Sequence, residues 1–329
     1  MPDLSTTYLG LKLDNPLIAS AGPLTHELGN IRALEDAGAA AVVLPSVFQE
    51  QIEQEADELE VAMTTGTESV AEASSFMPPI TWHSGSYEML ETIRRARAAV
   101  GIPVIASLNG VTGVGWVAYA KELEQAGASA IELNVYFVPT DPALTGRDVE
   151  AHYLTVLRAV KATVSIPVAM KLGPFFSAPA DVVRALDGAG ADGFVLFNRF
   201  YQPDIDLVTM RVQRDLALSS AVESRLPLLW IGVLAGTLRG SLAASTGVET
   251  ADEVVKYLLA GADAVMTTSA LLRHGVDHMA TLVRGLTQWL DARGANLADI
   301  KGRMSRARLR DPGAYERANY VRILQGWRP

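Results

Sequence analysis

Lys171 stands inside an otherwise apolar stretch, Val168 to Leu172, and it is the side chain most able to do chemistry in this sequence. A buried ammonium needs a negative partner. Two functions fit such a lysine: a fixed cation beside an electron-rich cofactor ring, or a nucleophile that forms a Schiff base. Either function makes Lys171 the first candidate catalytic residue.

The polar residues that end the neighbouring apolar stretches help to separate these two functions. They are amides and hydroxyls, namely Ser20, Ser107, Asn109, Asn134 and Asn198. Imine chemistry would usually place a carboxylate or a proton shuttle there. Neutral donors and acceptors suit the heteroatom edge of a planar ring better. We therefore favour cofactor contact, and a Schiff-base aldolase or isomerase stays open as an alternative.

Hydroxyls and a glycine follow the last two apolar stretches. They are Ser245-Thr246-Gly247 and Thr267-Thr268-Ser269. Backbone N–H groups in a glycine-containing turn and at the start of a helix bind anions, and barrel enzymes often bind phosphate at these two loops. The alternative is that these residues are ordinary helix caps and turns. Because both loops carry the pattern, we expect a phosphate-bearing ligand.

A repeated pattern indicates the elements that position these residues. An Ala-Gly-Ala or similar step closes a helical stretch in four places, and an apolar run follows at once: Glu35–Leu44, Glu124–Leu133, Asp187–Leu196 and Leu259–Met266. Glycine is favoured just after a helix because it adopts positive φ at little cost. The apolar runs do not alternate with polar residues, which is typical of parallel strands buried on both faces.

Four more strand candidates complete the pattern: Pro16–Ala21, Gly101–Leu108, Ser165–Leu172 and Ser241–Gly247. Helices are expected at about residues 29–38, 86–100, 113–126, 149–163, 179–189, 226–238, 250–260 and 270–292. Eight such units predict an α/β fold, a (β/α)₈ TIM barrel over residues 7–292. An open doubly wound sheet is the alternative, but no G-x-G-x-x-G follows the first strand.

Two segments depart from a minimal barrel. Residues 46–86 form a long insertion after the second strand, of the kind that often covers a functional site. Residues 301–329 carry eight basic side chains and two acids on a chain whose net charge is −9. We expect residues 1–300 to form the barrel domain, and we expect this basic C-terminal extension to pack on the barrel or on a subunit.

Composition excludes several other classes of protein. An acidic chain with 28 basic and 37 acidic residues is a poor nucleic-acid binder. The absence of cysteine excludes disulfides, thiol chemistry and iron–sulfur ligation by this chain. No apolar stretch is long enough for a membrane span, and no signal peptide is evident at Met1, so we expect a cytoplasmic protein. No metal site is expected.

These strand ends resemble the dihydroorotate dehydrogenase family of flavin mononucleotide (FMN)-dependent barrels over nearly the whole chain. The matching stretches are Asn15–Gly22, Ile131–Asn134, Pro167–Leu172, Asn198, Thr246–Thr250 and Leu258–Val265. The resemblance implies FMN across the barrel mouth. It implies that the isoalloxazine and ribityl parts lie near Ala19, Ser20, Asn109, Asn134 and Lys171. It also implies a phosphate site at Gly247, Thr267, Thr268 and Ser269.

Three substrate-facing elements depart from the family pattern. Phe137 falls on the position of the Cys or Ser base, Leu44-Pro45-Ser46 replaces a Thr-Lys pair, and Ser75–Pro79 replaces an Asn-rich loop. Phenylalanine cannot accept a proton. Tyr136 is a nearby replacement, although a phenol is a better acid than base, and Thr140, Asp141 and His83 are loop alternatives. His274 and His278 are read as a surface pair.

The resemblance predicts an FMN-dependent oxidoreductase acting on CH–CH donors, with dihydroorotate and pyrimidine biosynthesis as the family's substrate and pathway. We expect catalytic roles for Asn134, Tyr136, Lys171 and Asn198. The Phe137 position indicates that the true substrate can differ. A flavin-carrying partner or regulatory subunit of another redox enzyme is the first alternative, and the Lys171 aldolase is the second. We expect a small-molecule substrate, a possible protein electron partner and a homodimer.

Overall fold

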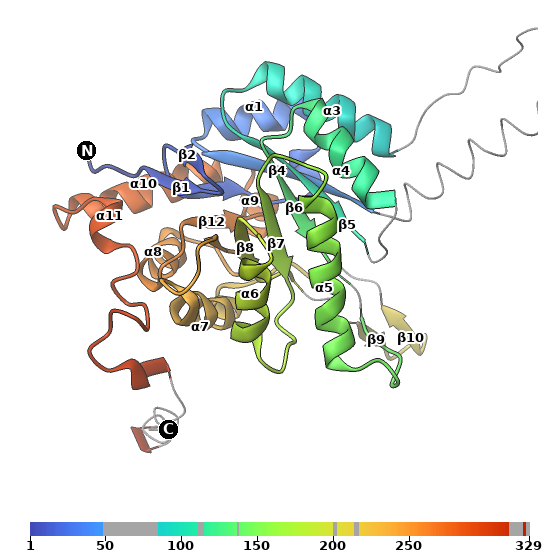
Figure 1. Cartoon of the computed structure of the whole chain (residues 1–329). Coiled ribbons are helices and arrows are strands. Elements are labelled where there is room, and N and C mark those ends of the chain that lie inside the picture. The colour runs from blue at the N-terminus through green and yellow to red at the C-terminus, as the bar shows by residue number, and fades with distance from the viewer. Residues whose placement is uncertain are drawn as a thin grey trace, which may run out of the picture.

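The computed structural model describes residues 1–48, 85–110, 115–136, 138–199, 203–213, 217–315 and 325–326. Eight strands of this part of the chain form a closed parallel barrel in the order β11-β12-β3-β4-β5-β6-β7-β8 (Figure 1). They are β3 (Leu17–Ala19), β4 (Ala41–Phe48), β5 (Val104–Asn109), β6 (Ala130–Asn134), β7 (Val168–Leu172), β8 (Gly193–Leu196), β11 (Ser241–Ala244) and β12 (Ala264–Thr267). The predicted barrel is confirmed, and closure between β12 and β3 excludes the open sheet.

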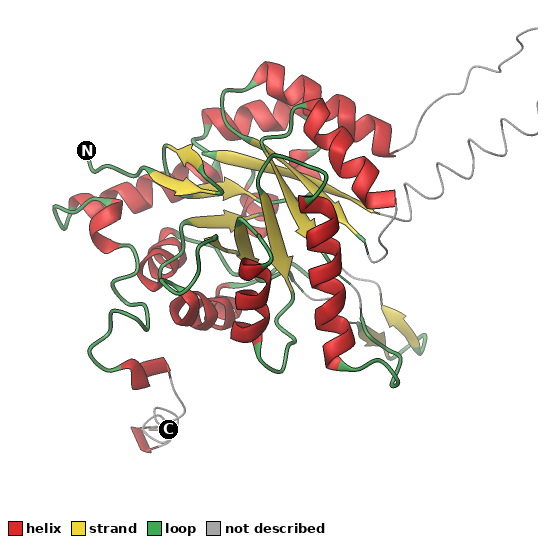
Figure 2. Cartoon of the chain, viewed as in Figure 1, coloured by secondary structure: helices red, strands yellow, loops and turns green. Residues whose placement is uncertain are grey.

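Helices lie between the strands and surround the barrel (Figure 2). They are α1 (Leu28–Asp36), α3 (Gly85–Ala99), α4 (Gly115–Ala126), α5 (Gly146–Lys161), α6 (Pro179–Gly188), α7 (Arg225–Leu234), α8 (Ala251–Ala260), α9 (Ser269–His274), α10 (His278–Asp291) and α11 (Leu297–Ile300). The prediction of one helix over residues 270–292 was wrong. Gly275, with φ 83°, ends α9 and separates it from α10.

The glycines of the sequence repeat end the helices as predicted. Gly38, Gly127, Gly190 and Gly261 have φ values of 92°, 101°, 100° and 122°. A residue with a Cβ is disfavoured at such φ values, so these glycines fix where each chain turn leads into the next strand.

Proline precedes three barrel strands. Pro16, Pro103 and Pro167 each stand just before the first strand residue. Their carbonyl oxygens accept hydrogen bonds from the neighbouring strands, for example from Ile131 N to Pro167 O at 2.9 Å. Proline lacks a donor and not an acceptor, so it joins the ladder at this end at no cost.

A hairpin that the sequence analysis did not predict closes the bottom of the barrel. It consists of β1 (Thr6–Tyr8) and β2 (Leu11–Leu13), paired antiparallel. Tyr8 and Leu9 are buried in the cluster of side chains inside the barrel, where most strand residues are small. A Cβ on Gly193 would lie 2.5 Å from Leu9 Cδ2. The small residues inside the strands thus make room for this plug.

The start of the basic extension lies against its own barrel. Gly302 N and Met304 N donate to Leu258 O and Leu259 O of α8 at 2.9 and 2.8 Å. Arg306 N donates to Gly232 O of α7 at 2.8 Å. The boundary at residue 300, and contact of the tail with a subunit, stay predictions.

The connection from β8 to α7 holds a second unpredicted hairpin, β9 (Asp204–Asp206) with β10 (Arg211–Gln213). The long insertion predicted after the second barrel strand lies between Phe48 and α3, and residues 49–84 are outside the described residues. Among the helices that the structure describes, none is long and apolar enough to cross a membrane.

Candidate functional site

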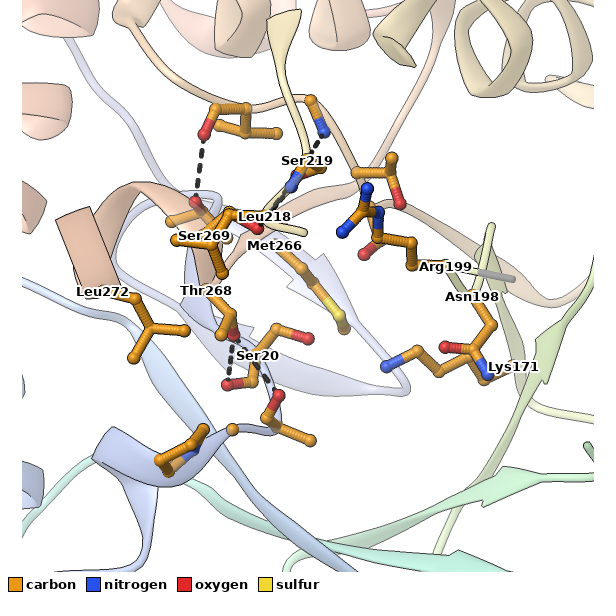
Figure 3. Close-up of a pocket in the computed structure, with 18 residues that line it drawn as sticks. Ser20, Lys171, Asn198, Arg199, Leu218, Ser219, Met266, Thr268, Ser269 and Leu272 are labelled. Atoms are coloured by element: carbon orange, nitrogen blue, oxygen red, sulfur yellow. Dashed lines mark hydrogen bonds between the residues drawn. The ribbon is translucent and has the colours of Figure 1, made fainter. Parts of the chain in front are cut away.

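A cavity of about 220 Å³ opens at the carboxyl ends of the barrel strands. Residues after β3, β8, β11 and β12 line it together with β7, including Ser20, Gly22, Lys171, Asn198, Gly247 and Ser269. Figure 3 shows Lys171 and Asn198 on one side, and Thr268, Ser269 and Ser219 on the other. Residues predicted from five separate strand ends therefore share one cavity.

Lys171 forms an ion pair with Glu132, whose Oε1 lies 3.0 Å from the lysine Nζ. The Lys171 side chain is 8% exposed and that of Glu132 is 1% exposed. The negative partner predicted for Lys171 is thereby confirmed, but its identity was missed. Glu132 is the acid within the apolar strand β6, and that placement was the available signal.

Two predicted amides contact one another beside this ion pair. Asn198 Nδ2 donates to Asn134 Oδ1 at 2.9 Å. Asn109, Asn134 and Lys171 occupy adjacent register positions on β5, β6 and β7. Asn109 and Asn134 are buried and do not line the cavity, whereas Asn198 does. A hydrogen bond between two amide side chains therefore links β6 to the residue after β8 at the mouth of the barrel.

Ser20 and Ala19 differ in their surroundings although both were predicted to contact a cofactor. Ser20 lines the cavity. Ala19 is buried in the core cluster between strands and helices and does not line it. Only Ser20 therefore presents a side chain at this end of β3.

The predicted hydroxyls brace the loops around the cavity. Thr267 Oγ1 donates to Val248 O at 3.0 Å, and Thr268 Oγ1 donates to Ser20 O at 2.8 Å. Ser269 Oγ accepts from Ser219 N at 3.1 Å and lies 2.9 Å from Ser219 Oγ. Ser219 comes from the irregular connection before α7, and no sequence pattern indicates it as a site residue. The hydroxyls thus fix the walls of the phosphate site that the sequence predicts.

Gly247 is a position that only glycine fits. Its φ is 73°, and a Cβ there would lie 2.6 Å from Ser224 N. At Gly22, which also lines the cavity, a Cβ would lie 2.6 Å from Thr268 Cγ2, so a side chain there would displace the threonine methyl group. Both glycines therefore present backbone alone to the cavity.

Tyr257 of α8 holds the loop that contains Gly247. Its hydroxyl donates to Thr246 O at 2.7 Å and to Ser224 O at 3.2 Å. Burial, assisted by the charge of Glu253, raises the pKa of Tyr257 well above its ordinary value. The phenol therefore keeps its proton and links the segment of Thr246 to the segment of Ser224.

In the histidine pair predicted to lie on the surface, His274 is exposed and His278 is half-buried, and both contact Glu249. His274 Nε2 lies 2.8 Å from Glu249 Oε1, and His278 Nε2 lies 2.8 Å from Glu249 O. Arg273 pairs with the same carboxylate and donates to Ser219 O at 2.6 Å. The sequence pattern does not indicate this contact, because it joins a loop to two separate helices.

Three of the residues predicted to handle a proton follow β6 along the chain. Tyr136 is half-buried, and Thr140 and Asp141 are exposed. Phe137 and His83 lie outside the described residues. Arg199, which was not predicted, lines the cavity and pairs with Glu223, with 3.4 Å between Nε and Oε1.

A closed parallel barrel with a cation and a glycine-walled cavity at its carboxyl end is the arrangement of (β/α)₈ enzymes. Residues 3–290 match the family described as dihydroorotate dehydrogenase, and the chain belongs to that family. It is accordingly an oxidoreductase.

Individual relatives agree with this assignment over most of their length. A protein of Aeropyrum pernix with the provisional name dihydroorotate dehydrogenase A (fumarate) is 30% identical over 315 residues, which covers 93% of this chain and 99% of the relative. The dihydroorotate dehydrogenase B (NAD(+)) catalytic subunit of Thermoplasma acidophilum is 26% identical over 303 residues, 88% of this chain and 95% of the relative. The same subunit of Methanocella arvoryzae is 28% identical over 306 residues, 89% and 95%.

Proposed function

We propose that this protein is an FMN-dependent oxidoreductase that acts on a CH–CH bond of a small molecule. One observation carries the proposal: Lys171 and the loop that contains Gly247 line the same cavity. A flavin mononucleotide needs a polar contact for its ring and an anion site for its phosphate. The names of the relatives support the same chemistry.

The residues present fit this cofactor. Gly22 and Gly247 line the cavity without a side chain of their own, and the amide of Asn198 adds neutral hydrogen-bonding capacity beside Lys171. The cavity is smaller than the roughly 300 Å³ at which ligand pockets begin. It adjoins a second cavity of about 310 Å³ that shares Asn198, Arg199 and Thr246.

Each part of the site then has a proposed role. Ser20 and Lys171, which line the cavity, would contact the ring, and Gly247 with Thr267–Ser269 would hold the phosphate. Asn109 and Asn134 would support the ring site from the register positions next to Lys171 on β5 and β6. Bound FMN would supply a ring that accepts a hydride from the substrate. Asn198, whose amide donates to Asn134, would orient the substrate.

Proton exchange with the substrate is proposed for Tyr136. It is the described ionisable side chain that follows Asn134 most closely along the chain. The sequence places Phe137 where the family pattern has a base, so dihydroorotate is proposed as the first substrate to test and not as the established one.

A Schiff-base aldolase that uses Lys171 is the second alternative. Glu132, whose Oε1 lies 3.0 Å from the lysine Nζ, provides a carboxylate of the kind that imine chemistry usually places beside the nucleophile. Borohydride trapping of a substrate adduct on Lys171 would support this alternative, whereas flavin absorption bands support the FMN proposal.

The experiment is an absorption spectrum of the purified protein followed by anaerobic addition of dihydroorotate. Flavin bands that bleach with dihydroorotate support the proposal with the family substrate. Flavin bands that bleach only with dithionite favour a different substrate or the flavin-carrying partner. A protein that lacks flavin bands even after incubation with FMN contradicts the proposal.

A further inference from the structure

Glu132 lies beneath the candidate site, one step deeper in the barrel than Lys171. In the register of β6 and β7, Asn134 is paired with Lys171 and Glu132 is paired with Ala169. The lysine side chain therefore turns from the mouth toward the barrel interior to reach the carboxylate. Its ammonium remains on the wall of the cavity, because Lys171 lines that cavity.

Within the described part of the chain, the second oxygen of the same carboxylate lacks a hydrogen-bond partner. Glu132 Oε2 is buried without a hydrogen bond among the residues that the structure describes, and so is the hydroxyl of Tyr8 in the barrel plug. Burial, followed by the charges of Glu132 and Asp263, raises the pKa of Tyr8 well above its ordinary value. The phenol thus stays neutral below the carboxylate, and Lys171 is the cation that compensates Glu132.

A buried carboxylate is costly unless its charge is matched, and one that served only for stability could be replaced by an apolar residue together with its lysine. Here the matched cation also faces a ligand cavity. The Lys171 ammonium interacts electrostatically with Glu132 inside the barrel and with any ligand in the cavity. Removing Glu132 would leave that charge uncompensated toward the cavity.

We propose that Glu132 is a positioning residue, which holds the Lys171 ammonium against the cavity and limits the positive charge that a bound ring experiences. The inference rests on the proposed FMN function. Reduction adds negative charge to the ring, so a stronger positive charge nearby favours the reduced cofactor over the oxidised one. Glu132 would therefore set the difference between the affinity for reduced FMN and the affinity for oxidised FMN, without contacting the ring itself.

The test compares wild type with Glu132→Gln, both loaded with FMN. The midpoint potential is measured by equilibration with a reference dye, and the dissociation constant of oxidised FMN is measured by quenching of flavin fluorescence. We expect the potential of Glu132→Gln to rise by about 30 mV or more, which for a two-electron couple is a tenfold gain in preference for the reduced form. A purely structural role would change the affinities for oxidised and reduced FMN equally and would leave the potential unchanged, and that result overturns the proposal.

Two further variants keep this test interpretable. Asp187→Asn removes another largely buried carboxylate, one paired with Arg239 away from the cavity, and should leave the potential unchanged. Glu132→Asp keeps the charge but withdraws it by one methylene, so its potential should fall between wild type and Glu132→Gln. It also serves as the test variant if Glu132→Gln does not fold. A Glu132→Asp potential equal to that of Asp187→Asn contradicts the proposal.

A cofactor-free measurement separates this inference from the proposed function. In urea unfolding of the apoprotein, Glu132→Gln should lower the midpoint, and Glu132→Gln/Lys171→Met should recover most of the loss because no lone buried charge remains. No loss in the single variant overturns the pairing, whether or not FMN binds. A wild-type chain that shows this pattern but binds no FMN overturns the proposed function, and with it the role of Glu132 toward a ring.

Discussion

The amide of Asn198 donates a hydrogen bond to Asn134 Oδ1 at 2.9 Å. The two residues end or follow β6 and β8, on either side of the strand that carries Lys171. The bond therefore joins the neighbours of the lysine across the barrel mouth. It also fixes the orientation of both amide groups.

We predict that Asn198→Ala destabilises the protein by about 1–3 kcal/mol, because the buried Oδ1 of Asn134 is left without its donor. Urea unfolding of Asn134→Ala, Asn198→Ala and the double variant measures the coupling. The double variant should cost less than the two single variants together. Strict additivity would show that the bond contributes nothing.

Gly247→Ala should abolish or strongly weaken FMN binding. The added Cβ would meet Ser224 N at 2.6 Å and force the loop to move. Gly10→Ala is the matched control, because Gly10 has the same φ of 73° but nothing within 4 Å of its Cβ position. Both variants carry a strain of about 1 kcal/mol or more. Fluorescence titration should show a loss of tenfold or more for Gly247→Ala only, and equal losses in both would refute the role of the loop.

Tyr257→Phe should weaken FMN binding by a smaller factor. It removes the hydroxyl that holds Thr246 O and Ser224 O, and each lost bond costs about 1 kcal/mol. Tyr153→Phe is the control: Tyr153 is also buried, burial raises its pKa to about 12, and it packs against Phe176 away from the cavity. An unchanged affinity in Tyr257→Phe would show that the loop does not need this support.

Protonation of Glu124 should lower the stability of the protein in acid. Hydrogen bonds from Lys121 and Ser165 lower the pKa of Glu124 from 4.5 to about 2. A depressed pKa in the folded state contributes stability that is present above pH 4.5 and is lost as the pH falls from 4.5 toward 2. Glu124→Gln should flatten the dependence of unfolding free energy on pH in this window, whereas Glu122→Gln on the exposed side of the same helix should not. Parallel curves for wild type and Glu124→Gln would contradict the assignment.

The repeat made most of the barrel predictable. Helix-ending glycines and strand-starting prolines are local signals, since they depend on φ and on a missing donor. Glu35 and Glu124 show what such signals omit: each accepts from the backbone at the start of a later strand, at Gly101 N with 2.7 Å and at Ser165 N with 2.8 Å. The repeat contains both glutamates, but their partners lie in the following βα units.

The site was predictable in its strand ends and not in its contacts. Lys171, Asn198 and Gly247 follow from their positions on the strands and loops. Glu132 was missed because its role depends on the side chain turning inward beside Lys171. Ser219 was missed because it lies in an irregular connection, where no periodicity indicates which residue reaches the cavity. The plug residue Tyr8 was missed because three-residue strands carry too little pattern.

The most direct test of the account is a titration of flavin-free protein with FMN and, in parallel, with riboflavin, which lacks the phosphate. Quenching of flavin fluorescence gives both dissociation constants. The account predicts one FMN per chain and riboflavin binding at least about 100-fold weaker, or about 2.7 kcal/mol. Equal affinities, or binding of neither flavin, would contradict it.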